Sequence, residues 1–302
     1  MKPEKKYRAS GIFCNGQSWG LTFIILAGVL WGATGTVTKY IFAFGLEPLT
    51  LALLRIGISF FTLFLFFWLT GRKIKPKRED WLFFMVFGAI SVALFNIFYL
   101  SAIQLTNVST AVVLLYTAPA FSVLVARLVL QERLTARKAV AVFLTIVGVI
   151  LMVGAYRPAH LAFSLTGILY GLGSGFTFGI YSVFAKAAMR RGYGSLETVV
   201  LGLGIGLLFL TFVRAPWVLL PLATAPPMLW LLVLVVAIFC TMLPYILFAN
   251  GLQYIEAGKA TLVAAVEPIV AIVLAMLLLG ETLAFTQMLG VVAVLLAIRS
   301  QT

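Results

Sequence analysis

One carboxylate lies deep inside an apolar stretch of the chain, and its type and position could do chemistry. Glu267 is about nine residues into an apolar run that begins near 258. If that run is a membrane helix, Glu267 lies roughly 13 Å along it, near the bilayer midplane. A charge there costs at least about 2.5–3.5 kcal/mol, so it should face protein or water. Glu267 could bind a substrate amine or exchange a proton, or it could be a carboxyl group hydrogen-bonded to neighbouring helices.

Two prolines lie at equivalent places in two apolar runs. Pro119 and Pro268 each remove a backbone donor and can bend a helix. The pair predicts either hinges for a moving protein or fixed kinks that only shape the packing.

Single aromatic and polar residues at mid-depth in several runs could line a binding cavity. Aromatic faces with a few polar groups suit amphipathic substrates, including ammonium groups held by cation–π contacts. Packing is the alternative, because aromatic residues make up 14% of the chain. Together with Glu267, the predicted substrate-binding residues are Trp31, Thr34, Asn96, Tyr99, Tyr116, Tyr181 and Tyr245.

Three cations lie within or near apolar runs. Lys39 and Lys186 are close to the ends of their runs, and snorkelling to the interface explains them. Arg55 lies about 12 Å into its run, and we expect a structural role for it. If several of these cations turned inward, the substrate would be an anion. Glu132 and Glu281 end their runs, and we expect them to anchor loops.

The residues that most enzymes need are scarce. His160 is the only histidine, and Cys14 and Cys240 have no metal-ligand spacing. No G-x-x-x-x-G-K-[ST] loop occurs, so direct ATP hydrolysis is not expected. The sequence predicts no catalytic residues, no metal and no cofactor.

The elements that position these residues are apolar helices. The chain is 63% hydrophobic and 10% charged, whereas soluble domains carry about 25% charged residues. Runs of about 20 apolar residues can cross a bilayer as helices. The first run is too long for a cleavable signal. We predict an all-α integral membrane protein with ten transmembrane helices at 19–41, 48–70, 81–103, 107–130, 137–155, 163–188, 196–213, 228–250, 258–279 and 284–299.

The net charge of +13 is spread over short loops rather than gathered on one face. This pattern predicts contacts with anionic lipids at the cytoplasmic surface and no nucleic-acid partner. With both termini in the cytoplasm, the loops on that side carry most of the basic residues. These include Arg72, Lys73, Lys75, Lys77, Arg78, Arg133, Arg137, Lys138, Arg190 and Arg191.

The chain contains an internal repeat. Gln104 and Gln253, Pro119 and Pro268, and Glu132 and Glu281 are each 149 positions apart, and Lys39 and Lys186 match at a distance of 147. We predict a cytoplasmic tail at 1–18, a first five-helix repeat at 19–155 and a second at 156–302. Because five is odd, the second repeat is inverted, as in many secondary transporters.

One predicted helix carries a glycine face. Gly167, Gly171, Gly175 and Gly179 recur every four residues, which predicts close helix packing or, alternatively, a sliding surface.

The sequence resembles the EamA-like branch of the drug/metabolite transporter superfamily over roughly residues 19–299. The resemblance is carried by Leu30-Trp-Gly-Ala-Thr, Leu54-Arg-Ile, Tyr116-Thr-Ala-Pro-Ala through Gln131-Glu-Arg-Leu, and Val266-Glu-Pro-Ile through Gly280-Glu-Thr-Leu. It implies ten helices, cytoplasmic termini, a central cavity between the halves and alternating access.

We therefore expect a secondary-active or facilitative transporter that exports small organic metabolites such as amino acids. An importer of choline-like cations or an exchanger of anions remains open, and a receptor or scaffold is a distant alternative. We expect a multi-pass protein of the cell (inner or plasma) membrane, as a monomer or homodimer, with proton coupling depending on Glu267.

Overall fold

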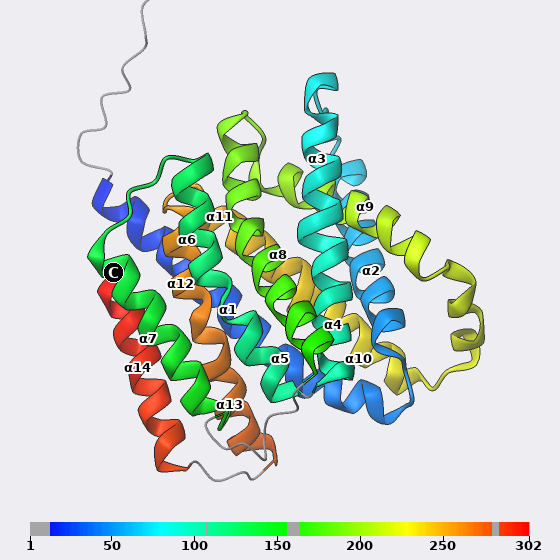
Figure 1. Ribbon diagram of the computed structural model, residues 1–302. Helices are drawn as coiled ribbons and strands as arrows, with labels where there is room; N and C mark the ends of the chain where they lie inside the picture. Colours follow the sequence, from blue (N-terminus) through cyan, green and yellow to red (C-terminus); the bar gives the residue numbers. More distant parts are fainter. Residues whose placement is uncertain (1–12, 107, 156–163, 280–283, 302) are drawn as a thin grey trace, which may run out of the picture.

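The structure is a computed structural model that describes residues 13–106, 108–155, 164–279 and 284–301. In these residues the secondary structure is helical, without strands (Figure 1). The first half contains α1 (Phe13–Ala43), α2 (Pro48–Leu69), η1 (Arg78–Asp80), α3 (Trp81–Gly88), η2 (Ala89–Leu94), α4 (Phe95–Leu105), α5 (Val108–Leu115), α6 (Ala118–Val129) and α7 (Ala136–Met152). The second contains α8 (Leu165–Arg190), α9 (Ser195–Val213), η4 (Pro216–Thr224), α10 (Pro227–Ala237), η5 (Ile238–Met242), α11 (Leu243–Leu252), α12 (Ala257–Val263), η6 (Ala264–Val266), α13 (Glu267–Leu279) and α14 (Phe285–Gln301).

Helical segments occupy all ten predicted spans, and four spans consist of consecutive segments. Eight helical stretches of the described residues are long and apolar enough to cross a membrane. The other two, α7 and α14, have 17 residues each and measure about 26 Å. The prediction of an all-helical membrane protein is confirmed, whereas ten crossings stay a prediction.

The predicted domain limits fall partly outside the described residues. Residues 1–12 of the expected tail and 156–163 at the expected repeat boundary are not described, nor are His160 and Glu281. Within the described part, α1 already begins at Phe13, before the expected start at Trp19. Figure 1 shows the beginning of α1 and the end of α14 on the same side of the bundle.

The repeat is visible in the pairing of α7 with α14, which lie side by side at one edge of the bundle (Figure 1). A Cβ atom on Gly290 would lie 2.5 Å from the carbonyl oxygen of Gly148, so the backbones touch there. Ala141 of α7 and Ala297 of α14 are fully buried in one apolar cluster, which also includes Val123 and Leu262. Ala141 matches Gly290, and Gly148 matches Ala297, at the repeat distance of 149. The two helices therefore meet through equivalent small residues.

Two π-helical segments occupy equivalent places in the repeats. Segment η2 begins at Ala89, and η5 begins 149 positions later at Ile238. Ser91 in η2 corresponds to Cys240 in η5. Short π segments inside α-helices are frequent at functional sites, because they rotate the side chains that follow.

The glycine face of α8 packs closely against α5 and α6. A Cβ atom on Gly175 would lie 2.7 Å from the Leu114 carbonyl oxygen, and one on Gly179 would lie 2.5 Å from that of Ala118. The predicted close packing is confirmed. It holds a second-repeat helix against the interrupted helix of the first repeat.

Candidate functional site

Two interrupted helices form the frame of the candidate site. The helical path breaks between α5 and α6, just before Pro119, and again at η6, just before Pro268. Proline is favourable in the first turn of a helix, where its missing N–H has no intrahelical partner. Each proline therefore starts a new half-helix. A hinge at either position stays a prediction.

Glu267 is the first residue of α13, directly after the second interruption. Its carboxylate interacts electrostatically with Arg55 of α2, Tyr99 of α4, Tyr116 and Tyr245 of α11. Glu267 and Tyr99 are half-buried, whereas Tyr116 and Tyr245 are buried. Arg55, Tyr99 and Tyr116 come from the first repeat and Tyr245 and Glu267 from the second, so this cluster lies between the repeats.

Arg55 and Glu267 have opposite charges but form no ion pair among those of the described residues. The Arg55 Nε is buried without a hydrogen-bond partner. The Tyr116 hydroxyl interacts with the Glu267 carboxylate, and the Thr34 hydroxyl interacts with the Cys240 thiol. A buried polar group left unpaired costs about 1–3 kcal/mol. Arg55 can therefore gain free energy from a ligand that offers it an acceptor.

An aromatic layer lies beside the polar cluster. The ring centroids of Trp31 and Tyr245 are 5.7 Å apart, and those of Tyr181 and Tyr245 are 5.0 Å apart. Trp31 also meets Phe178 at 5.7 Å, and these two residues match at the repeat distance of 147. The layer therefore joins the two repeats, and Tyr245 connects it to Glu267.

The predicted substrate-binding residues separate into three groups. Tyr99, Tyr116, Tyr245 and Glu267 form one cluster with Arg55. Thr34 lies beside Cys240, which also interacts electrostatically with Arg55. Trp31 and Tyr181 belong to the aromatic layer. Asn96 is 3% exposed, and its side-chain amide donates to the Val92 carbonyl oxygen at 2.7 Å, so its own helix engages it. Substrate binding by any of them stays a prediction.

Arg55 is the member of this cluster that sequence reasoning did not assign to the site. The repeat contains a signal that could have found it. Arg55 corresponds to Gly202 at a distance of 147, and Glu267 corresponds to Ala118 at 149. Each charge therefore lacks a counterpart in the other repeat. Arg55 and Glu267 are thus two opposite charges, at similar depth, that the other repeat does not contain. This pattern could have predicted that they interact inside the bundle.

Other charged residues hold helices together at the end of the bundle where α8 terminates. The Lys186 ammonium donates to the carbonyl oxygens of Leu252 and Ile255, the latter at 3.0 Å, so Lys186 holds the end of α11 rather than only snorkelling. Glu132 accepts from the backbone N–H groups of Ala257 at 2.7 Å and Gly258 at 3.3 Å. The expected anchoring role of Glu132 is confirmed, and its target is a helix N-terminus. The side chain of Lys39 lies outside the described part.

Two ion pairs between the repeats lie at opposite ends of α2 and α9. Arg191 binds Asp80, whose carboxylate also accepts from the Tyr193 hydroxyl at 2.8 Å. Arg214 binds Glu47 at the other end. Burial raises the pKa of the Tyr193 phenol, so this hydroxyl keeps its proton near neutral pH.

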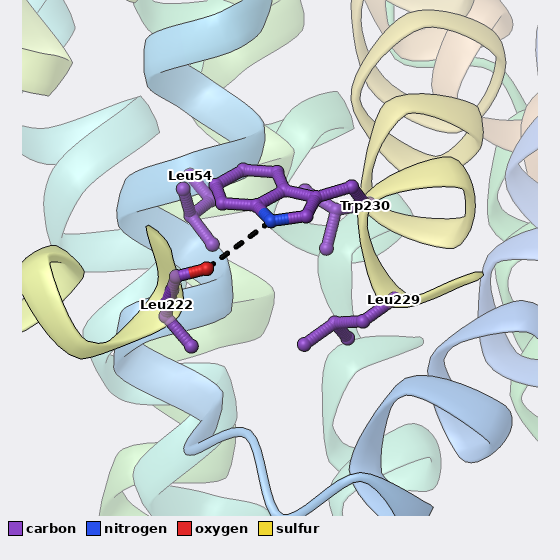
Figure 2. Close-up of a pocket in the computed structure, with 5 residues that line it drawn as sticks. Leu54, Leu222, Leu229 and Trp230 are labelled. Carbon is purple, nitrogen blue, oxygen red and sulfur yellow. Dashed lines mark hydrogen bonds between the residues drawn. The ribbon is translucent and has the colours of Figure 1, made fainter. Parts of the chain in front are cut away.

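A small peripheral pocket lies between α2, η4 and α10, as Figure 2 shows. Leu54, Leu222, Leu229 and Val233 supply apolar side chains. The Trp230 indole N–H donates to the Leu222 carbonyl oxygen at 3.2 Å. Since that bond satisfies the indole N–H, the pocket has no side-chain donor or acceptor to offer a ligand.

Comparisons with known proteins match both repeats separately. The model of the EamA-like transporter family matches residues 18–154 and 165–299. An uncharacterized transporter of Archaeoglobus fulgidus is 29% identical over 90% of the chain and 92% of its own length. The uncharacterized inner membrane transporter YicL of Salmonella typhimurium is 25% identical over 91% and 92%, respectively. A crystal structure with 17% identity superposes with a TM-score of 0.78, covering 94% of this chain and 96% of its own, which shows the shared fold.

Proposed function

The chain belongs to the EamA-like transporter family, and from this premise we propose that it exports small zwitterionic metabolites, amino acids foremost. Its relatives are named as transporters. The observation that carries the substrate class is the unpaired Arg55 beside Glu267 in the interior. An amino acid brings the two opposite charges that these side chains need. Its ammonium group binds Glu267, and its carboxylate binds Arg55, whose planar guanidinium suits a carboxylate.

The proposed mechanism is alternating access between the two repeats. Arg55 belongs to the first repeat and Glu267 to the second, so a zwitterion bound to both bridges the moving halves. The interruptions before Pro119 and Pro268 allow the half-helices to change their angle without breaking a continuous hydrogen-bond ladder. Proton coupling involves the same carboxylate, because a protonated Glu267 attracts an ammonium group weakly.

Transport of a choline-like cation is the second candidate. Tyr99, Tyr116 and Tyr245 surround the Glu267 carboxylate, and aromatic rings around a negative charge suit a quaternary ammonium group. In this case Arg55 has no direct role in binding. The two candidates therefore differ in their dependence on Arg55.

Counterflow in proteoliposomes tests the proposal. Vesicles are loaded separately with an unlabelled neutral amino acid, choline or a sugar phosphate, and uptake of the matching tracer is measured. We expect amino-acid counterflow, with kcat/KM reduced about 10–100-fold in both Glu267→Gln and Arg55→Gln, since a hydrogen bond to a charged group contributes about 1.5–3 kcal/mol. The exposed residues Glu79 and Arg137 provide matched controls as Glu79→Gln and Arg137→Gln, which should transport normally.

The pattern across variants decides between the candidates. Choline counterflow that Glu267→Gln abolishes and Arg55→Gln preserves would establish the cation transporter. Sugar-phosphate counterflow alone would establish an anion exchanger. No tracer accumulation with folded protein in any loading would contradict the proposed substrate.

We also propose an orientation and a location for the protein. Both termini are placed in the cytoplasm of a prokaryotic cell, in the inner or plasma membrane, since the basic loops gather on that side. The start of α1 and the end of α14 lie on the same side of the bundle, which supports an even number of membrane crossings (Figure 1). A reporter enzyme active only in the cytoplasm, fused after Thr302, should be active; an inactive but stable fusion would reverse the orientation.

A further inference from the structure

A second pocket lies along α8, away from the Arg55 and Glu267 cluster. Its volume is about 410 Å³, within the range of small-molecule sites. The floor is a stripe of α8 that includes Phe176, Ile180 and Ala187, and Arg191 follows directly after the end of the helix. Phe83 of α3 and Val125 of α6 belong to the two walls. Figure 1 shows α8 between α6 and α3. We call this pocket the α8 groove.

The α8 groove is long, apolar and charged at one end only. Arg191 is the one lining residue that is not apolar. The stripe from Phe176 to Arg191 extends about 22 Å along the helix, which exceeds the roughly 15 Å of one bilayer leaflet's hydrocarbon. A chain that enters beside Arg191 can therefore stay in contact with the groove across the leaflet.

The charged end has free capacity for an anion. The Arg191 guanidinium lies 4.3 Å from the ring centroid of Phe83 and binds Asp80, and its side chain is still 46% exposed. Lys77 donates from its ammonium group to the Arg191 carbonyl oxygen at 3.2 Å. Arg190 directly precedes Arg191 and donates to the Leu130 carbonyl oxygen at 2.9 Å. These three cations outnumber the nearby carboxylates of Asp80 and Glu197, and guanidinium has five N–H donors for oxygen atoms.

We propose that the α8 groove binds an anionic phospholipid, with one acyl chain along α8 and the phosphate on Arg191 and Lys77. A free phosphate makes no contact with the apolar stripe, and a lipid without net charge is attracted only weakly by the cations. Anionic lipids are abundant in the leaflet that faces basic loops. Lys77, Phe83 and Val125 come from the first repeat, and the α8 stripe comes from the second. The bound lipid therefore holds the two repeats together, independently of the transported substrate.

Native mass spectrometry of the full-length, delipidated protein tests this inference. The protein is mixed with phosphatidylglycerol or with phosphatidylcholine of the same acyl chains, and retained lipid is counted. We expect preferential retention of phosphatidylglycerol. Arg191→Gln should lower it about fivefold, as expected for one basic residue near an anionic surface. Ala187→Leu, which fills the groove floor, should lower retention of the same lipid, whereas Arg137→Gln on α7 should not.

Arg191→Gln removes the ion pair with Asp80 and could prevent folding. Ala187→Leu leaves the charged end intact, so its lipid retention tests the inference in that case. Equal retention of the two lipids, or full retention by Ala187→Leu, would overturn the inference. A lipid-free dimer that Ala187→Leu dissociates would also overturn it, since a second copy would then occupy the groove.

Discussion

The Glu132 carboxylate fastens the end of α6 in the first repeat to the start of α12 in the second. It is 6% exposed, and its two oxygens accept from the N–H groups of Ala257 and Gly258. These N–H groups belong to the first turn of α12, where donors lack intrahelical partners and the helix dipole favours a negative charge. Lys138 lies 3.4 Å from the same carboxylate. Glu132→Gln removes the charge while keeping the size.

The expected cost follows from these contacts. The glutamine retains one acceptor oxygen and turns an NH₂ group toward the second N–H donor. Hydrogen bonds to a charged group contribute about 1.5–3 kcal/mol, and a charge at a partly buried helix terminus up to about 2 kcal/mol. Lys138 limits the damage because it keeps its ion pair with Glu256 at 2.7 Å. We expect a total loss of about 2–4 kcal/mol in the free energy of unfolding, which lowers Tm by roughly 3–6 °C in a chain of this size.

The assay is thermal unfolding of the full-length protein in detergent, followed by tryptophan fluorescence. Glu79→Gln is the matched control, because Glu79 is an exposed carboxylate and the same charge is lost. Its Tm should stay near that of the parent protein. Equal Tm values for Glu132→Gln and the parent would refute the reasoning. An equal loss in both variants would refute it as well, since net charge rather than the contact would then be responsible.

Three further substitutions test other contacts in the same unfolding assay. Gly290→Val should lower the free energy of unfolding by about 1–3 kcal/mol, because a Cβ atom at this position would lie 2.5 Å from the Gly148 carbonyl oxygen. An unchanged Tm would show that α7 and α14 are not in contact. Asp80→Asn removes the ion pair with Arg191 and should lower the free energy of unfolding by only about 1 kcal/mol, because the Arg191 side chain is 46% exposed. Salt screens such a pair, so the difference from the parent protein should shrink in high salt. A difference that grows with salt would contradict the ion pair. Thr261→Val should lower the free energy of unfolding by about 1–2 kcal/mol, because the Thr261 hydroxyl lies 3.0 Å from each of two buried serine hydroxyls. Thr261→Ser keeps the hydroxyl and should be nearly neutral. Equal losses in the two variants would indicate a packing effect.

The sequence by itself determined the class of protein and the positions of its elements. A bilayer requires about 20 apolar residues per spanning helix, so the spans are visible in composition alone. The repeat at 149 positions revealed the duplicated unit. Proline lacks a backbone donor, and the structure interrupts helices just before both Pro119 and Pro268. These properties are local, and they are therefore readable before any tertiary contact is known.

Only the tertiary structure decided which residues meet. The sequence placed Glu267 at mid-depth, but it did not bring Arg55 into the same cluster. A helix that is apolar on all sides shows no amphipathic pattern, so its inward face cannot be read from periodicity. The π segments η2 and η5 rotate the following residues further. The inward face of α2, and with it the position of Arg55, depends on the packing of helices far away in the chain.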